Sequence, residues 1–260
     1  MRGTRLEHIG GIIRTEQNWI GGNRMNPVGA AFVPPEPEEV PGLLSDLIEF
    51  VNSSELPPVA IAAIAHAQFE TIHPFADGNG RTGRALIHAI LHASITPRAT
   101  IPPVSLALAA DRNRYIQNLS IYRTDEEADR QAAVNEWVEY FANALSESCR
   151  RAIDFEQSIE AVKTRWRETT SFRKNSAGAQ LIDLLPGTPV ISIRTAQELT
   201  GKSYPAARLA VLALEEAGIL HQNAKNRKSG IYVAEDIMRE FNIYERALAT
   251  ISGDTAIETI

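Results

Sequence analysis

The chain has 260 residues, a length that suits one larger domain joined to a smaller one, and its hydrophobic fraction of 44% is enough to fill a core in each. Its net charge is −6 at pH 7, whereas a protein that coats nucleic acid or an anionic membrane would carry an excess of Lys and Arg. Composition therefore argues against a protein built mainly for such polyanions, although a local basic patch is still compatible with it.

The first twenty residues mix charged residues with short apolar pieces and lack the unbroken apolar core of a signal peptide. No later stretch is apolar for long enough to span a bilayer. The single cysteine, Cys149, cannot form a disulfide within the chain, and no set of Cys and His residues has the spacing of a zinc site. We therefore expect a soluble protein of the cytoplasm that does not bind a membrane.

Residues 9–33 contain two short β-prone pieces, IGGII and AAFV, which predict a hairpin with an irregular turn at Gly21-Gly22-Asn23. Apolar residues at helical spacing then predict a helix over residues 40–51. The next predicted helix, about residues 59–72, is apolar nearly all round, which is typical of a buried central helix. It must end near His73, because the proline that follows disfavours helical geometry in the residue before it.

A tight turn is predicted over residues 76–79, and from Gly80 to Ala93 apolar residues again recur on one helix face. Three further helices are predicted over residues 104–120, 126–146 and 152–169. The first part of the chain is therefore expected to be helical apart from its hairpin.

Residues 169–178 are polar and lack a periodic pattern, which indicates a linker. The pieces AQLIDLL, RTAQELTG and SYPAARLAVLALEEAGIL follow, and then a β-prone ending, HQNAKNRKSGIYVA. Three short helices and a two-stranded wing in this order are typical of a winged helix-turn-helix. We predict such a domain over residues 179–245, with a tail over residues 246–260.

Residues 73–84, HPFADGNGRTGR, carry most of the candidate chemistry. Gly78 and Gly80 let the backbone approach a ligand, and the helix after them presents unpaired N–H groups to an anion. Arg81 and Arg84 stand three apart, so they share a helix face and can both reach phosphate oxygens. Asp77 is a hard oxygen ligand suited to a Mg²⁺ ion that arrives with the phosphates.

His73 lies at the edge of this predicted anion site, and its near-neutral pKa suits proton abstraction from a hydroxyl. Asn79 could brace the turn or donate its amide to a phosphate. Taken singly, an Asp-Gly-Asn-Gly turn or a histidine before proline is more often structural than catalytic. A plain turn has no use for this set of polar groups at fixed offsets, so their combination favours a functional site.

The segment resembles the signature of the Fic family, His-x-Phe-x-Asp/Glu-Gly-Asn-Gly-Arg-x-x-Arg, with every fixed position filled. IGG, AAFVPPEPEEVPGLLSDL and HAQFETIHPF also resemble the family's flap, the helix after it and the approach to its motif. The resemblance implies a mainly α fold, with a Fic-type helical core over residues 1–168 and a β-hairpin flap at about residues 9–33. The final third resembles the small winged-helix domain often joined to such cores.

Family membership implies transfer of AMP from ATP to a Ser, Thr or Tyr hydroxyl of a target protein, with release of pyrophosphate. His73 would be the base that activates this hydroxyl, and Asp77 the ligand of Mg²⁺. The family's phosphate-binding positions correspond to Gly78, Asn79, Gly80, Arg81 and Arg84. Tyr115 and Asn118 fall where the family's following helix lines the nucleotide pocket, which makes them weaker candidates.

Gly80 favours AMP transfer, because the related Doc phosphotransferases carry lysine at this position. The flap would hold the target segment by strand addition, and its alternative role is that of a stabilising edge hairpin. We expect His66, His88 and His92 to be ordinary core or surface histidines. Glu70, one turn before the motif, is expected to be structural.

Two other functions stay open. One is the removal of AMP, or the transfer of another phosphate-containing group, by the same site. The second is a nucleotide-sensing DNA-binding regulator, and its support is a set of basic residues in the tail: Arg194, Lys202, Arg208, Lys225, Arg227 and Lys228. Glu198, Glu215 and Glu216 dilute that charge, so a homodimer contact or a target-presenting module is an equal alternative for the domain.

Many Fic proteins carry an inhibitory helix, Ser/Thr-x-x-x-Glu-Gly/Asn, whose glutamate pairs with the second motif arginine, here Arg84. The predicted flap begins close to Met1, which leaves no room for that helix upstream. Ser45 to Glu49 and Thr164 to Glu168 have the spacing but lack the following Gly or Asn. We therefore expect a chain that is unrestrained as it stands, or one whose inhibitory glutamate comes from a separate partner protein.

Overall fold

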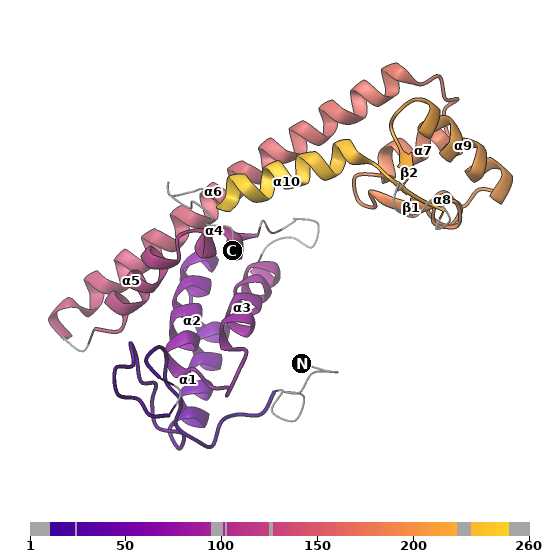
Figure 1. The fold of residues 1–260 in the computed structure, drawn as a ribbon. Coiled ribbons are helices and arrows are strands. Elements are labelled where there is room, and N and C mark those ends of the chain that lie inside the picture. The colour runs from indigo at the N-terminus through magenta and orange to yellow at the C-terminus, as the bar shows by residue number, and fades with distance from the viewer. Residues whose placement is uncertain are drawn as a thin grey trace. The chain divides into compact units, whose positions relative to one another are not determined.

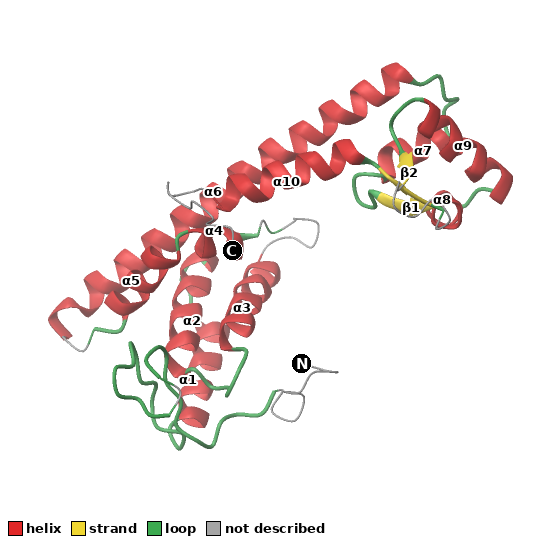
Figure 2. Cartoon of the chain, viewed as in Figure 1, coloured by secondary structure: helices red, strands yellow, loops and turns green. Residues whose placement is uncertain are grey.

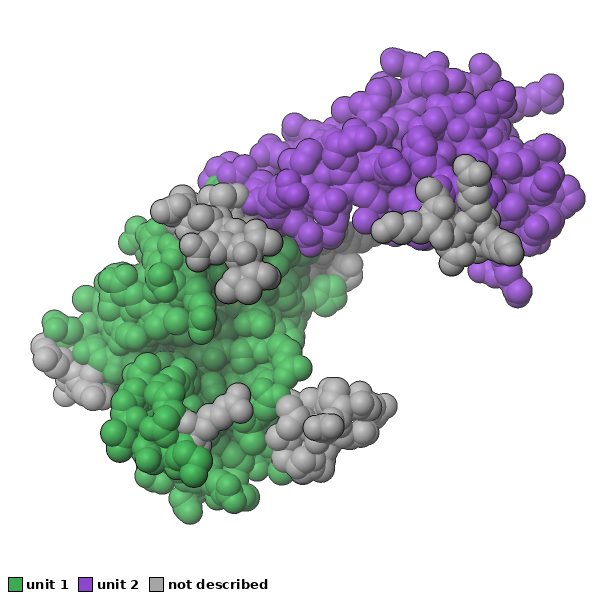
Figure 3. All heavy atoms as spheres, in the orientation of Figure 1, with its two compact units in different colours: residues 1–148 green, residues 149–260 purple. Residues whose placement is uncertain are grey.

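The computed structural model describes residues 11–23, 25–94, 101, 103–124, 127–222 and 230–249, and every structural statement below concerns these residues. They form two compact units, Met1–Ser148 and Cys149–Ile260 (Figure 3). The fold is mainly α, as predicted, with ten helices and one three-stranded sheet in the described ranges (Figures 1 and 2). None of these helices is both long and apolar enough to cross a membrane.

The first unit is built around helix α2, Pro58–Ile72, which contacts α1, Val40–Ser53, and α3, Asn79–Ser94. Helix α2 begins with a proline, whose missing N–H costs nothing in the first turn. Nine of its residues are buried, which confirms the predicted central helix. Apolar residues of the three helices form the core together with Trp137, whose indole N–H donates to the carbonyl of Ala63 over 2.7 Å.

Two predictions about the helices after residue 103 are wrong. The single helix predicted over residues 104–120 is divided into α4, Val104–Ala110, and α5, Arg112–Tyr122, because Asp111 leaves helical geometry and caps α5 by accepting from the N–H of Arg114. The two helices predicted over residues 126–146 and 152–169 are one, α6, Glu127–Thr169. No Gly or Pro lies within it to end it.

The predicted hairpin does not form as a regular pair of strands. Between residues 11 and 39, leaving Arg24 aside, the structure has isolated bridges only, Ile13 with Phe75 and Ile20 with Phe32. Backbone turns with positive φ at Gly21 and Gly22 let the segment double back. Side-chain hydrogen bonds to distant backbone groups, described below, hold the segment where a strand ladder was expected. Residues 9 and 10 of the predicted flap lie outside the described residues.

The second unit contains the C-terminal half of α6 and seven further elements: α7 Ala177–Leu184, β1 Val190–Ser192, α8 Ile193–Thr200, α9 Tyr204–Glu216, β2 His221–Gln222, β3 Ile231–Val233 and α10 Glu235–Ala249. The three strands are antiparallel in the order β1-β3-β2. The three short helices and the two β-prone ends of the predicted wing are present. Strand β1 and helix α10 were not predicted, and the assignment to the winged helix-turn-helix class stays a prediction.

Candidate active site

The motif occupies the connection between α2 and α3, and His73 ends α2 in an unusual conformation. Its φ of 48° and ψ of 57° lie in the left-handed region, which a side chain rarely adopts. Its N–H still closes the helix by donating to the carbonyl of Phe69 over 2.9 Å. A strained residue at this position persists only when its surroundings hold it, so the contacts of His73 matter.

Arg14 and Asn18 hold this end of α2. The Nε of Arg14 and the Nδ2 of Asn18 donate to the carbonyl oxygen of His73 over 3.0 and 3.3 Å. The Arg14 guanidinium also donates to the carbonyl of Pro35, and its backbone N–H donates to that of Pro74 over 2.9 Å. Sequence reasoning missed both residues, because neither belongs to a periodic pattern or to the motif.

The His73 imidazole is half-buried, and its Nδ1 is buried without a hydrogen-bond partner among the described residues. Burial lowers the pKa of this imidazole, the positive charges of Arg123 and Arg14 lower it further, and the backbone of Glu70 acts in the opposite direction. A lowered pKa keeps the imidazole neutral near pH 7. The side chain is therefore ready to accept a proton.

Asn79 braces the turn. Its Oδ1 accepts from the N–H of Phe75 over 2.9 Å, and its Nδ2 donates to the carbonyl of the same residue over 2.7 Å. Its side chain is almost fully buried. The backbone at Gly78 has a φ of 92°, which only glycine adopts readily. Of the two roles considered for Asn79, bracing is the one that the hydrogen bonds display.

The two motif arginines have different surroundings. Arg81 lies at the surface, where its Nη2 forms an ion pair of 3.0 Å with Oδ2 of Asp77. Arg84 is half-buried and forms no hydrogen bond or ion pair within the described ranges. A Cβ atom on Gly80 would lie 3.2 Å from Nη1 of Arg84, so glycine leaves room for this guanidinium. Arg84 is thus the motif cation without an ion pair, although its charge acts on the nearby buried carboxyl of Glu70 and lowers the pKa of that group against the effect of burial.

Beneath the start of α3 lies a buried polar cluster that sequence reasoning took for ordinary structure. A Cβ atom on Gly83 would lie 2.6 Å from Oε1 of Glu70 and 3.1 Å from Nδ1 of His66, and neither atom has a hydrogen-bond partner among the described residues. Burial lowers the pKa of His66 to about 4 and raises the pKa of Glu70. The absence of a side chain at Gly83 therefore lets α2 and α3 approach each other over these groups.

The two weaker candidates lie on α5, and Tyr115 belongs to the buried cluster beneath Gly83. The hydroxyl of Tyr115 is 2.9 Å from Nε2 of His66, and burial raises the pKa of this phenol. Asn118 is buried, and its amide donates to the carbonyl of Arg114 in its own helix over 2.8 Å. The structure therefore brings together residues 73–84 but joins neither candidate to them by a hydrogen bond. Their nucleotide-binding roles stay predictions.

A groove of about 540 Å³ opens beside the end of α2, and sequence reasoning missed it. Arg123 lies on its wall, where Nε donates to Oγ1 of Thr71 over 3.1 Å and Nη2 to the carbonyl of Glu70 over 3.0 Å. The same guanidinium lies 3.8 Å from the ring centre of Phe32. Gln68 also lines the groove, and its Oε1 is buried without a partner among the described residues.

The side chains of the described residues do not form a metal site alone. No group of three or more His, Cys, Asp or Glu among them could hold an ion. Asp77 offers one exposed carboxylate beside the turn. This donor fits a hard cation such as Mg²⁺ whose other ligands are phosphate oxygens and water.

Comparison with known proteins gives the family of this region. Residues 3–91 match the model of the Fic/DOC family. The protein adenylyltransferase fic-1 of Caenorhabditis elegans is 37% identical over 95 residues, which are 35% of this chain and 17% of that protein. The protein adenylyltransferase Fic of Drosophila yakuba is 37% identical over 115 residues, 43% of this chain and 20% of that protein.

A probable protein adenylyltransferase of Aquifex aeolicus is 47% identical over 64 residues, 24% of this chain and 20% of that protein. The chain thus spans about a fifth of the length of the curated relatives it matches. A solved Fic family protein from Desulfovibrio desulfuricans aligns with 85% of this chain and 62% of its own, at a TM-score of 0.48 and 23% identity. The family match includes the whole motif, and this N-terminal part of the chain is similar to the Fic/DOC family and related to protein adenylyltransferases.

Proposed function

We propose that this chain transfers AMP from ATP to a hydroxyl side chain of a target protein. The observation that carries the proposal is the position of His73, a half-buried imidazole with a lowered pKa, fixed at the end of α2 immediately before the phosphate-binding turn. In the reaction the hydroxyl oxygen attacks the α phosphorus. The bond from that phosphorus to the oxygen bridging the α and β positions breaks, and pyrophosphate leaves.

His73 takes the proton of the attacking hydroxyl. Because Nδ1 is buried, Nε2 is the nitrogen left to meet the target. The hydrogen bonds from Arg14 and Asn18 hold the residue in its strained conformation and so fix the direction of the imidazole. Such positioning matters because general-base catalysis requires a hydrogen bond of about 2.6–3.2 Å between base and nucleophile.

The phosphates bind at the start of α3. The backbone N–H groups near Gly78 and Gly80 face the anion, and Arg84 supplies a guanidinium that forms no hydrogen bond or ion pair among the described residues. The pair between Arg81 and Asp77 is exposed, so its separation costs little, about 0–1 kcal/mol. Asp77 would then hold Mg²⁺, which supplies charge neutralisation of the phosphates, and Arg81 would bind a phosphate oxygen.

The groove lined by Thr71 and Arg123 is the proposed position of the adenine ring of ATP. Its lining combines the Phe32 ring, the Arg123 guanidinium and Gln68, whose Oε1 is buried without a partner among the described residues. An acceptor buried without a partner costs about 1–3 kcal/mol, which a ligand donor would recover. The amino group of adenine is such a donor, whereas guanine carries an acceptor at the same position. Gln68 would therefore favour ATP over GTP.

The test uses ATP labelled either on the α or on the γ phosphate, incubated with the pure protein and a cell lysate. Covalent α label and no γ label on protein is the expected result, and because Arg84 is unpaired the chain should also label itself without any activating substitution. Transfer of the γ label would mean phosphorylation. Release of AMP from labelled protein without its attachment would mean the reverse reaction, which uses the same residues.

A further inference from the structure

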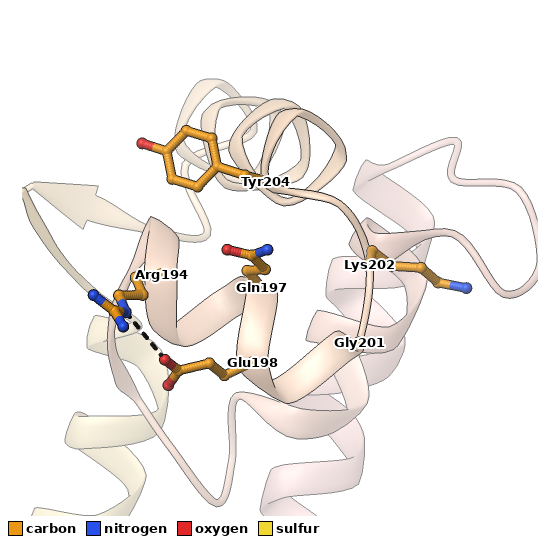
Figure 4. Close-up of a pocket in the computed structure, with 6 residues that line it drawn as sticks. All are labelled: Arg194, Gln197, Glu198, Gly201, Lys202 and Tyr204. Atoms are coloured by element: carbon orange, nitrogen blue, oxygen red, sulfur yellow. Dashed lines mark hydrogen bonds and ion pairs between the residues drawn. The ribbon is translucent and has the colours of Figure 1, made fainter.

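An open groove of about 610 Å³ lies between α8 and the start of α9 in the second unit (Figure 4). Two of its lining residues, Arg194 and Glu198, are exposed and form an ion pair of 3.2 Å, so their charges offset each other. Water can satisfy the remaining hydrogen-bonding capacity of such exposed groups, so they indicate no particular ligand. A polar group in a core is different, because it needs a partner from the protein or from a ligand.

Glu70 is a polar group of this second kind, and it lies in the first unit. The residue is only 7% exposed, and its Oε1 has no hydrogen-bond partner among the described residues. Burial raises the pKa of the carboxyl, whereas the positive charges of Arg123 and Arg84 act to lower it. The charge state of this carboxyl therefore depends on how close those two guanidinium groups stay.

Glu70 and Arg84 lie on either side of one position in the first turn of α3. A Cβ atom on Gly80 would lie 3.9 Å from Oε1 of Glu70 and 3.2 Å from Nη1 of Arg84. Glycine therefore leaves the carboxyl and the guanidinium without a side chain between them. Arg84 is half-buried and has a long flexible side chain, so it can turn inward to the carboxyl or outward to a ligand.

The other titratable groups around Glu70 are His66 on α2, Tyr115 on α5 and Arg123 at the end of α5. Burial lowers the pKa of His66 to about 4, so this imidazole is neutral near pH 7. Burial raises the pKa of Tyr115, so this phenol keeps its proton. Hydrogen bonds from Nε and Nη2 hold Arg123 in place. Among the described residues, Arg84 is thus the cation near Glu70 that no hydrogen bond holds.

We propose that Glu70 is a positioning residue of the nucleotide site, which draws Arg84 inward when ionised and binds a proton when Arg84 turns to a phosphate of ATP. Carboxylate and phosphate compete for the same fork of N–H donors. Once the guanidinium has turned outward, an ionised carboxyl would stay in the core with less compensation, so it takes a proton from the solvent. This role rests on the proposed function, because it requires ATP phosphates at the start of α3.

The coupling gives ATP affinity a definite dependence on pH. ATP favours the protonated carboxyl, so the pKa of Glu70 is higher in the complex than in the free protein, where burial already raises it. Below the free-state pKa the carboxyl is protonated in both states, and this group does not alter the affinity. Above it, binding takes up a proton and Kd rises by at most about tenfold per pH unit, until the pKa of the complex is passed.

The test is calorimetry of the full chain with Mg²⁺ and α,β-methylene ATP, which cannot transfer AMP, over about pH 5–9. Pairs of buffers with different ionisation enthalpies give the number of protons taken up per nucleotide bound. Glu70→Gln imitates the protonated carboxyl, so it should lose up to about one proton of uptake and bind up to about tenfold more tightly at high pH. Glu49→Gln, at an exposed position of α1, is the matched control and should behave as the wild type.

Arg84→Ala is a second test, which does not require the Glu70 variant to fold. Without this guanidinium the nucleotide draws no cation away from Glu70, so proton uptake should fall by a similar amount. Equal uptake in the wild type and both variants would overturn the role of Glu70, as would weaker binding by a Glu70→Gln protein that unfolds at the wild-type temperature.

Transfer of the α label from ATP is measured separately in the wild type. Normal transfer without any difference in proton uptake would remove the role of Glu70 and leave the proposed function in place. Absence of both nucleotide binding and transfer in the wild type would overturn the two together.

Discussion

Two connections between helices, α2 to α3 and α8 to α9, are built in opposite ways. The first is strained at His73 and is held by side chains from distant parts of the sequence, Arg14 and Asn18 among them. The second has a glycine where the backbone turns left-handed and uses local caps only. Polar groups are buried around the first connection and exposed around the second.

The difference shows how each connection can work. Strain and buried polar atoms persist only where the surrounding structure fixes them, which is what a reacting group requires. A relaxed turn with exposed side chains fixes only the relative placement of the two helices. That placement is sufficient for a surface that binds a large partner. Substitutions at and around the two connections test this contrast.

The largest effect is expected for His73→Ala. Transfer of the α label should fall by at least about 100-fold, because general-base catalysis contributes about 10²–10⁴. ATP affinity, measured by calorimetry, should change little, since other groups hold the phosphates. If the variant still labels protein at the wild-type rate, the first connection is not a catalytic one.

Gly83→Ala should destabilise the first unit by about 1–3 kcal/mol, because the added methyl group would lie 2.6 Å from Oε1 of Glu70. Gly42→Ala is the matched control: it lies in helix α1 and its added methyl group meets nothing within 4 Å. That control should be neutral or stabilising by up to about 1 kcal/mol. Urea unfolding monitors both, and equal stability of the two variants would contradict the close approach of α2 and α3.

Gln68→Leu should reduce the preference for ATP over GTP by up to about tenfold, since a net hydrogen bond contributes about 0.5–1.5 kcal/mol. The ratio of kcat/KM for the two nucleotides is the measurement. Gln131→Leu, at an exposed position of α6, is a control that should leave the ratio unchanged. An unaltered ratio in the Gln68 variant would mean that the nucleotide base binds elsewhere.

The pH dependence of kcat/KM should reflect the lowered pKa of His73. The base works when unprotonated, so the rate should fall as pH drops through this pKa, and the midpoint should lie below the usual histidine value of about 6.5. Arg123→Gln removes a positive charge near the imidazole and should move the midpoint upward, whereas Arg123→Lys should not. A midpoint above 6.5 in the wild type would contradict a half-buried base whose pKa is lowered.

A modest effect on stability alone is expected in the second connection. Gly201→Ala should cost about 1–2 kcal/mol, because a left-handed backbone is unfavourable for a residue with a Cβ atom even in open space. Gly201→Asn should recover part of that cost. Equal stability of the alanine variant and the wild type would show that this turn adapts more readily than its geometry indicates.

Local patterns in the sequence were sufficient to predict α1, α2 and α3. The apolar periodicity predicted the length of each helix, and the proline after His73 predicted where α2 ends. The motif between them was equally readable, because its chemistry lies in consecutive residues. The division of the predicted helix at Asp111 was not predicted. The Asp111 carboxylate caps a new helix and so competes with continuation of the preceding one, and apolar periodicity does not detect this.

Other parts depended on contacts that no local pattern encodes. The N-terminal segment looked like a hairpin because of its β-prone residues, yet hydrogen bonds from Arg14 and Gln17 to distant carbonyls replace the ladder. Strand β1 has three residues and exists by pairing with β3, about forty positions later. The groove at Arg123 arises where four separate segments meet. Such features are tertiary in origin.

The hydrogen bond from Arg14 to His73 also has a consequence for folding. It joins residues that are 59 positions apart, so it can form only after a long loop has closed. Helix formation takes about a microsecond and needs local contacts alone, whereas closure of non-local contacts is slower. A refolding chain should therefore recover its helical circular dichroism first and its activity afterwards, because the strained histidine acquires its orientation in the last step.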